Sequence, residues 1–169
     1  MEMLGIDSVG AVSFGFTVYD EDGNYLAEEE QVSIAISGDS TEGVDTSGTE
    51  IYTDDNVTMI YKGIAEDSSS YSDDIHLLIL VVNQSDEVIY VDDSYDSLSI
   101  NGYMTDYYCY STELSAGVCA LLDVELDADS LSENGVGSID DITEIVMGFE
   151  ITNEDYDTMA EPQVTIQIE

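Results

Sequence analysis

The sequence predicts an all-β protein: an immunoglobulin-like antiparallel β-sandwich with about seven strands and one short helical turn, preceded by an extra β-hairpin. Apolar and polar residues alternate with a period of two along much of the chain, which is typical of half-buried strands. Asp-Gly and Asn-Gly pairs, which favour tight turns, separate these segments. Apolar residues make up 43% of the 169 residues, enough to build a core. We therefore expect a hairpin over residues 1–36, a linker over 37–55 and the sandwich domain over 56–169.

The N-terminal part alternates in two segments. From Val12 to Val18, and again from Val32 to Ile36, every second side chain is apolar. The acidic stretch 20–24, which contains Gly23, lies between them and suits a hairpin connection. Because an isolated hairpin is marginal in water, we expect residues 1–36 either to pack on the complete domain or to add to a sheet edge of a neighbouring molecule. The second outcome would be self-association.

The remaining elements follow from composition and periodicity. Ser, Thr, Gly, Asp and Glu dominate residues 37–56, which we interpret as the linker. The run 77–82 is apolar on both faces, which predicts a central strand covered on each side. Ser130 and Glu133 have the spacing of a capping box and a Gly follows them, so we expect one short helix here. The predicted strands of the sandwich are 57–64, 75–82, 87–91, 98–100, 103–110, 118–126, 145–151 and 164–168.

The first 36 residues resemble the last 36. One single-residue gap aligns Ile6-Asp7 with Ile139-Asp140, Gly15-Phe16 with Gly148-Phe149, Ala27-Glu28 with Ala160-Glu161, and Val32, Ile34 and Ile36 with Val164, Ile166 and Ile168. A hairpin that ends the sandwich and also precedes it indicates a tandem array divided part-way through a unit. The competing interpretation is that two acidic hairpins simply share a pattern.

Several segments together resemble a known group of domains. They are Asn-Val-Thr-Met-Ile-Tyr-Lys-Gly-Ile at 56–64, Leu-Ile-Leu-Val-Val-Asn-Gln-Ser at 78–85, Leu-Ser-Ile-Asn-Gly-Tyr-Met at 98–104, Asp-Ser-Leu-Ser-Glu-Asn-Gly-Val at 129–136 and Ile-Asp-Asp-Ile at 139–142. The group comprises tandem, uncharacterised immunoglobulin-like β-sandwich domains of secreted or surface-anchored proteins from clostridial-type Gram-positive bacteria. The resemblance covers residues 56–169 and, as a partial unit, 1–36. It implies the fold, repetition and an extracellular or cell-surface location, and no catalytic site.

The charge of the chain is extreme and restricts its partners. Asp and Glu number 39 against a single basic residue, Lys62, which gives a formal net charge of −38 at pH 7. Nucleic acid is excluded as a partner, because its phosphates require Lys and Arg. An anionic membrane surface is excluded for the same reason. The near absence of basic residues is also where the chain departs from the group it resembles.

Calcium is the one cofactor that this composition favours, because hard cations bind crowded carboxylates. Asp92, Asp93 and Asp96 are the best candidate ligands, since they converge beside a strand end. None of the acidic clusters has a complete calcium motif, and turn formation or a solvated surface is the simpler explanation of each. The other clusters are Asp20, Asp22 and Asn24; Asp54 and Asp55; and Asp140 and Asp141.

The cysteines and the histidine offer little chemistry. Cys109 and Cys119 flank residues 112–117, which we interpret as a hairpin turn, so a disulfide between them is one option and two unpaired thiols the other. His76 has no second imidazole with which to share a zinc ion. No nucleophile motif surrounds either cysteine, and we expect no enzyme activity.

The tyrosines are the remaining candidates for a binding surface. Of twelve in the chain, four gather at Tyr103, Tyr107, Tyr108 and Tyr110. An exposed strip of such rings would contact a sugar or a protein, whereas cross-strand packing would bury them. We expect a non-catalytic structural or adhesive module of a repeated surface or secreted protein. The alternative is a module that binds calcium or carbohydrate.

Overall fold

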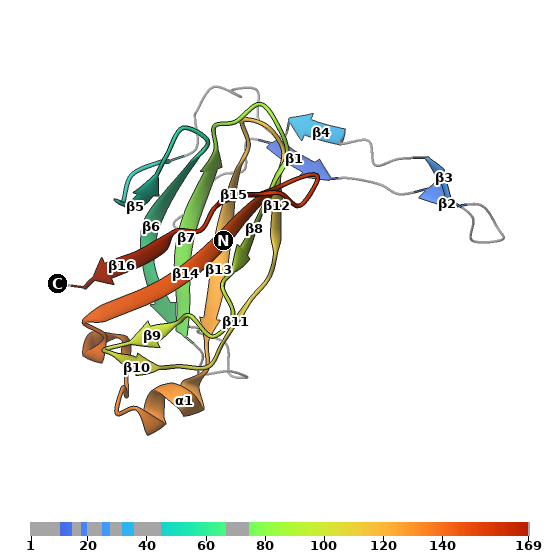
Figure 1. Cartoon of the computed structure of the whole chain (residues 1–169). Helices are drawn as coiled ribbons and strands as arrows, with labels where there is room; N and C mark the ends of the chain where they lie inside the picture. The colour runs from blue at the N-terminus through green and yellow to red at the C-terminus, as the bar shows by residue number, and fades with distance from the viewer. Residues whose placement is uncertain are drawn as a thin grey trace. The chain divides into compact units, whose positions relative to one another are not determined.

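The structure is a computed structural model that describes residues 45–66 and 75–168, together with the backbone of four short strands nearer the N-terminus (Figure 1). The chain forms two compact units, Met1–Asp45 and Thr46–Glu169. The second unit contains two antiparallel sheets of five and seven strands, so the prediction of an all-β sandwich is confirmed.

The five-stranded sheet has the order β11-β13-β7-β6-β5. Its strands are β5 (Thr49–Thr53), β6 (Val57–Glu66), β7 (Ile75–Asn83), β11 (Tyr107–Cys109) and β13 (Cys119–Leu126). The central strand is β7, in which Leu77 and Ile79 face one side and Leu78 and Leu80 the other. All four side chains are buried, as the apolar run predicts.

The seven-stranded sheet is organised around β14 (Glu144–Asn153). One edge of β14 pairs first with β9 and then with β8, and the other edge pairs first with β16 and then with β15. The remaining strands of this sheet are β8 (Ile89–Asp93), β9 (Ser99–Ile100), β10 (Tyr103–Met104), β12 (Thr112–Leu114), β15 (Thr158–Ala160) and β16 (Gln163–Gln167).

The facing sides of the two sheets form one hydrophobic core. Leu77 and Ile79 of β7 and Val124 of β13 meet Met147 and Phe149 of β14 in this cluster. All five side chains are fully buried, and burial of such side chains is worth about 1.5–3 kcal/mol each. Along one side of the sandwich β16 contacts β5, while β11 is the strand at the opposite edge of its sheet.

Local signals in the sequence account for several connections. Asn101 and Gly102 have φ angles of 52° and 82°, the left-handed pair that a two-residue turn between β9 and β10 requires. The helix α1 (Ala128–Glu133) ends at Asn134, and Gly135 follows with φ 82°. A short 3-10 turn, η2 (Ile139–Asp141), precedes β14.

Three details of the predicted organisation are wrong. The strand β5 lies inside the predicted linker 37–55, because its backbone pairs with β6 although its side chains are mostly exposed or half-buried. The described part of the sandwich has more strands than about seven, because β5, β12 and β15 lie outside the predicted segments and the segment 103–110 is divided into β10 and β11. The N-cap of α1 is Asp127, whose carboxylate accepts a hydrogen bond from the Ser130 backbone N–H, so Ser130 is not the cap.

In the described part of the first unit, four short strands form two antiparallel pairs. They are β1 (Ala11–Phe14) with β4 (Val32–Ala35), and β2 (Val18–Tyr19) with β3 (Tyr25–Ala27). This pairing matches the predicted hairpin within residues 1–36. The predicted turn 20–24 lies outside the described residues.

One buried polar side chain joins the two sheets. Asn83, at the end of β7, is 1% exposed. Its amide nitrogen donates to the carbonyl oxygens of Glu87, Leu114 and Ser115 at 2.9, 3.1 and 3.1 Å. Its oxygen accepts from the backbone N–H and the hydroxyl of Ser85. Because Leu114 belongs to β12, this contact ties the five-stranded sheet to the seven-stranded sheet.

Candidate functional site: an acidic groove lined with tyrosine

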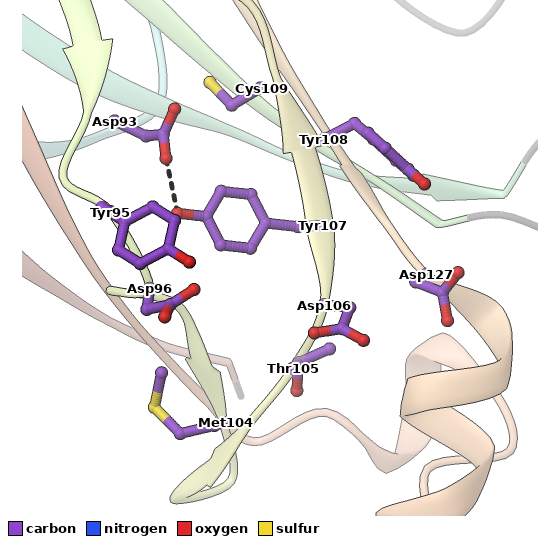
Figure 2. Close-up of a pocket in the computed structure, with 10 residues that line it drawn as sticks. All are labelled: Asp93, Tyr95, Asp96, Met104, Thr105, Asp106, Tyr107, Tyr108, Cys109 and Asp127. Carbon is purple, nitrogen blue, oxygen red and sulfur yellow. Dashed lines mark hydrogen bonds between the residues drawn. The ribbon is translucent and has the colours of Figure 1, made fainter.

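A groove of about 690 Å³ lies beside β11 and the segment that follows β8. It therefore occurs where the edge strand of the five-stranded sheet approaches the seven-stranded sheet. The lining combines four carboxylates with three tyrosines (Figure 2). These residues are Asp93, Asp96, Asp106 and Asp127, and Tyr95, Tyr107 and Tyr108, together with Met104, Thr105 and Cys109.

A hydrogen bond between the sheets forms the inner wall of the groove. The hydroxyl of Tyr107, in β11, donates to Asp93 Oδ2 at 2.6 Å and also to the Ser94 carbonyl at 3.3 Å (Figure 2). Burial raises the pKa of Tyr107 to about 12, and the hydrogen bond to Asp93 adds to that effect. Tyr107 therefore stays neutral at physiological pH and fixes the position of the Asp93 carboxylate.

The outer parts of the groove are exposed. Tyr95 and Tyr108 are 90% and 61% exposed, and both belong to the lining. Tyr95 comes from the turn after β8, and Tyr108 comes from β11, where its ring points away from Tyr107 (Figure 2). Met104 is 58% exposed. Large apolar surface that is left open beside carboxylates distinguishes this groove from ordinary charged surface.

One carboxylate oxygen of Asp127 has a structural role. Its Oδ1 atom accepts from the Ser130 backbone N–H at 2.7 Å and so caps α1. The Ser130 hydroxyl in turn accepts from the Asp106 backbone N–H, and this bond ties the segment before β11 to the helix. The helix thus holds the end of the groove opposite Asp93.

The three predicted calcium ligands are not brought together. Asp93 is paired with Phe149, whereas Asp92 is paired with Glu150, so the two carboxylates belong to opposite faces of the sheet. Asp93 and Asp96 line the groove and Asp92 does not. Within residues 45–66 and 75–168, no three His, Cys, Asp or Glu side chains gather closely enough to hold a metal ion.

The predicted hairpin between the two cysteines is wrong. The chain leaves the five-stranded sheet after Cys109, pairs in the other sheet as β12 and returns at Cys119. Cys109 is consequently opposite Val124, five residues along β13 from Cys119, or roughly 17 Å at the rise of a strand. A disulfide cannot span that distance, and both thiols are free.

Neither thiol is activated. Burial, and to a lesser degree the charges of Asp93, Asp92 and Asp123, raises the pKa of Cys109 to about 12. Burial also raises the pKa of Cys119. The register pairs His76 with Glu125 and Cys109 with the neighbouring Val124, so these two residues face opposite sides of the sheet. His76 Nδ1 lies 2.9 Å from Asp123 Oδ1.

The predicted tyrosine strip is partly present in the groove. Tyr107 and Tyr108 line it, while Tyr103 and Tyr110 are exposed but lie outside its lining. The sequence prediction did not include Tyr95. A bulky aromatic residue between Ser94 and Asp96, in an otherwise polar turn, was the signal that could have indicated it.

Comparisons with known proteins give structural likeness only. No protein-family profile and no curated protein matches the sequence. A FixG-related protein from Vibrio parahaemolyticus is similar, with 16% identity, a TM-score of 0.31, and coverage of 68% of this chain and 98% of that one. The ycdA protein from Bacillus subtilis has 12% identity and a TM-score of 0.39 over 72% of this chain and 39% of its own. A protein from Archaeoglobus fulgidus has 14% identity and a TM-score of 0.32, covering 67% and 95%.

In the part of the chain that the structure describes, no helix is long and apolar enough to cross a membrane.

Proposed function

We propose that this chain is a non-catalytic structural or adhesive module of a repeated bacterial surface or secreted protein, and that the acidic groove lined with tyrosine is its contact surface. The observation that carries this proposal is the exposure of Tyr95 and Tyr108 in the lining of one groove. Exposed aromatic rings are over-represented in binding surfaces because a ring offers a large apolar area at low entropic cost.

The framework suits a contact role. The rings are presented by a sandwich with a continuous core, and the bond from Tyr107 to Asp93 holds the floor of the groove in place. A partner would consequently meet a surface that is already organised, which lowers the entropic cost of association. The two thiols with raised pKa values, and the separation of His76 from Cys109, support the non-catalytic assignment.

The groove favours a partner that combines hydrogen-bond donors with an apolar or cationic face. Carboxylates accept from hydroxyl, amide or ammonium groups, and tyrosine rings stack on sugars or on cationic side chains. A net charge of −38 would also attract a basic partner over a distance that shortens as salt is added. A protein or a glycan meets these requirements, and nucleic acid does not.

The test is a screen of immobilised glycans and surface proteins with the full chain and with a double variant, Tyr95→Ser with Tyr108→Ser. The expected result is a bound partner whose signal falls at least about tenfold in the double variant. Tyr156→Ser is the matched control, since Tyr156 is 76% exposed but lies outside the groove and stacks on Tyr90. Equal losses in both variants, or a signal that neither changes, would remove the groove from the proposal.

The second candidate is a module that binds calcium or carbohydrate, and the convergence of Asp93 and Asp96 on the groove favours it. A cation that binds the folded state raises the melting temperature with log concentration beyond occupancy. The experiment compares CaCl₂ with NaCl at equal ionic strength, because screening of the negative charge also stabilises the fold. If calcium stabilises no more than sodium, or equally in Asp93→Asn, a specific calcium site in the groove is ruled out.

A further inference from the structure

The two halves of the internal repeat have the same backbone pairing. The alignment places residues 11–19 on 144–152, and residues 32–35 on 164–167. Val12 pairs with Ile34 as Ile145 pairs with Ile166, and Phe14 pairs with Val32 as Met147 pairs with Val164. Similar sequence patterns alone do not dictate an identical register.

A register shift in the strand pairing also occurs at the same position in both halves of the repeat. Val18 pairs with Ala27 and Tyr19 with Tyr25, with a register shift between the two pairs. At the aligned positions Ile151 pairs with Ala160 and Thr152 with Thr158, again with a shift between them. Such bulges are specific features of a strand pair. The first unit therefore reproduces the pairing of β14 with β15 and β16, the hairpin that closes the sandwich.

In the complete sandwich the other edge of β14 has partners. Ile145 and Val146 pair with Ile100 and Ser99 of β9, and residues 149–153 pair with β8. Among the described strands of the first unit, β1 pairs with β4 and β2 with β3, and no strand equivalent to β8 or β9 accompanies them. No described strand of the first unit pairs with the edge of β1 and β2 that matches this face of β14.

A glycine present in both halves of the repeat indicates how further strands on that edge would be connected. Gly148 lies under the connection between β8 and β9: an added Cβ would come within 3.1 Å of the Ser94 side chain and 3.3 Å of Ser97 Cβ. The backbone of Gly148 exchanges hydrogen bonds with the Ser97 hydroxyl at 3.1 and 3.2 Å. Gly15 occupies the aligned position in the first unit. The sequence therefore keeps, at this position, the residue type that a strand connection of the β8–β9 kind requires at Gly148.

We propose that residues 11–35 are a second closing hairpin, and that the free edge of β1 and β2 accepts two antiparallel strands, equivalent to β9 and β8, from another sandwich of this kind that lacks its own closing hairpin. The partner is therefore a related module, joined by main-chain hydrogen bonds and by apolar side chains that alternate into its core. This inference is independent of the groove.

The first experiment is a graft within the full chain that changes no length. Residues 144–152 are replaced with the sequence of 11–19, except that Thr152 is kept in place of the aligned Tyr19 because position 152 is buried. The graft keeps Gly and Phe at 148 and 149 and keeps apolar residues at the buried positions 145, 147 and 151. The expected result is one cooperative melting transition within about 15 °C of the wild type, because only conservative changes reach the core. The matched control inserts residues 10–18 instead, which shifts the pattern by one residue and should abolish the transition.

The outcomes of the graft are decisive either way. A graft that melts like the shifted control shows that residues 11–19 cannot close a sandwich, and it overturns the inference. The triple variant Ile145→Val with Met147→Phe and Ile151→Val tells which part fails. If the triple variant folds and the graft does not, the outward-facing residues of 11–19 are incompatible with the sandwich. If neither folds, the core-facing residues of 11–19 are incompatible with it. Both results count against the inference.

The second experiment tests the partner directly, with full-length chains at high salt to suppress repulsion between them. The acceptor is Gly15→Pro with Gly148→Pro. Proline at 148 removes the N–H that donates to the Ser97 hydroxyl and places a ring beside Ser94 and Ser97, and Gly15 is the aligned residue, so neither of the acceptor's own hairpins should fit against β8 and β9. The donor is the wild type. The expected result is a one-to-one complex by light scattering, which is lost when the donor is Gly15→Pro. If acceptor and wild type stay monomeric at every concentration, donation of the hairpin between molecules is excluded.

Discussion

Two polar contacts join the five-stranded sheet to the seven-stranded sheet, and they differ in their surroundings. Asn83 extends from the end of β7 to the end of β12 and is 1% exposed. Its side chain makes five hydrogen bonds, to atoms of Ser85, Glu87, Leu114 and Ser115. Tyr107 reaches across from β11 to Asp93, and the bond between them forms the wall of an open groove.

This difference in burial separates the Asn83 contact, which serves the fold, from the Tyr107 contact, which lies at a surface that a partner can reach. A buried amide that bonds to carbonyl oxygens cannot be changed without removing a donor from each of those oxygens. A tyrosine hydroxyl beside solvent can be replaced by water, so its loss costs less. Stability should therefore depend strongly on the contact made by Asn83 and weakly on the residues of the groove.

The largest expected effect is that of Asn83→Leu. The substitution removes the Asn83 donor from the carbonyls of Leu114, Glu87 and Ser115. The Glu87 carbonyl keeps the Ser85 hydroxyl and the Ser115 carbonyl keeps the Val118 N–H. Because the Leu114 bond is buried and the acceptor for Ser85 is lost as well, we expect a loss of about 2–4 kcal/mol in the free energy of unfolding. Urea denaturation followed by circular dichroism measures it.

Asn153→Leu is the matched control for Asn83→Leu. Asn153 also ends a strand, but its oxygen accepts from Asp155 and Asp157 in an exposed turn. We expect a loss of less than about 1 kcal/mol for this variant. Similar losses in the free energy of unfolding for the two variants would show that burial does not determine how much an asparagine at a strand end stabilises the fold.

A smaller effect is expected for Tyr107→Phe. Removing the hydroxyl breaks the bond to Asp93 but leaves the ring in place, and the freed carboxylate lies at a groove that solvent reaches. We expect a loss of about 0.5–1.5 kcal/mol in the free energy of unfolding. A loss of about 2–4 kcal/mol would instead show that Tyr107 matters to the fold as much as Asn83 does.

The pH dependence of stability sharpens the same contrast. The pKa of Tyr107 is raised from 10.0 to about 12 in the folded chain, so the folded state holds this proton more tightly than the unfolded state. The stability that this contributes is complete below pH 10 and is lost as the pH rises towards 12. Between those values the wild type should lose more stability than Tyr107→Phe, as measured by urea denaturation at each pH. Parallel losses in both proteins would assign the alkaline destabilisation to other groups, such as Tyr52, whose pKa is also raised to about 12.

The sequence predicted what local periodicity and turn chemistry determine. The alternation in 118–126 and 145–151 predicted strands of the sandwich. The Asn101-Gly102 pair predicted a turn, and these two residues form the left-handed turn between β9 and β10. The strand β5 was missed because Ile51 and Tyr52 are its only apolar residues. Its strand conformation depends on pairing with β6, which a single segment does not reveal.

The groove and the contact made by Asn83 depend on pairing between distant segments, so the sequence could not predict them. An asparagine at the end of an apolar run has the appearance of a turn residue, and only the position of β12 gives it carbonyl partners from the other sheet. In the same way, Cys109 and Cys119 flank a plausible turn, but β12 pairs with β8 and separates them. Crossings between sheets are set by the whole fold rather than by local sequence.

The smallest expected effect on stability is that of the groove's exposed rings. Tyr95→Ser and Tyr108→Ser each remove a ring that is mostly surrounded by solvent, so the free energy of unfolding should change by no more than about 0.5 kcal/mol. Thermal melts of both variants beside Asn83→Leu measure the contrast. A loss of 2 kcal/mol or so in either variant would mean that the ring is held in place for the fold, and the reason for treating it as a contact surface would disappear. Unchanged stability would leave two large apolar groups whose exposure the fold itself does not require, and contact with a partner accounts for such groups.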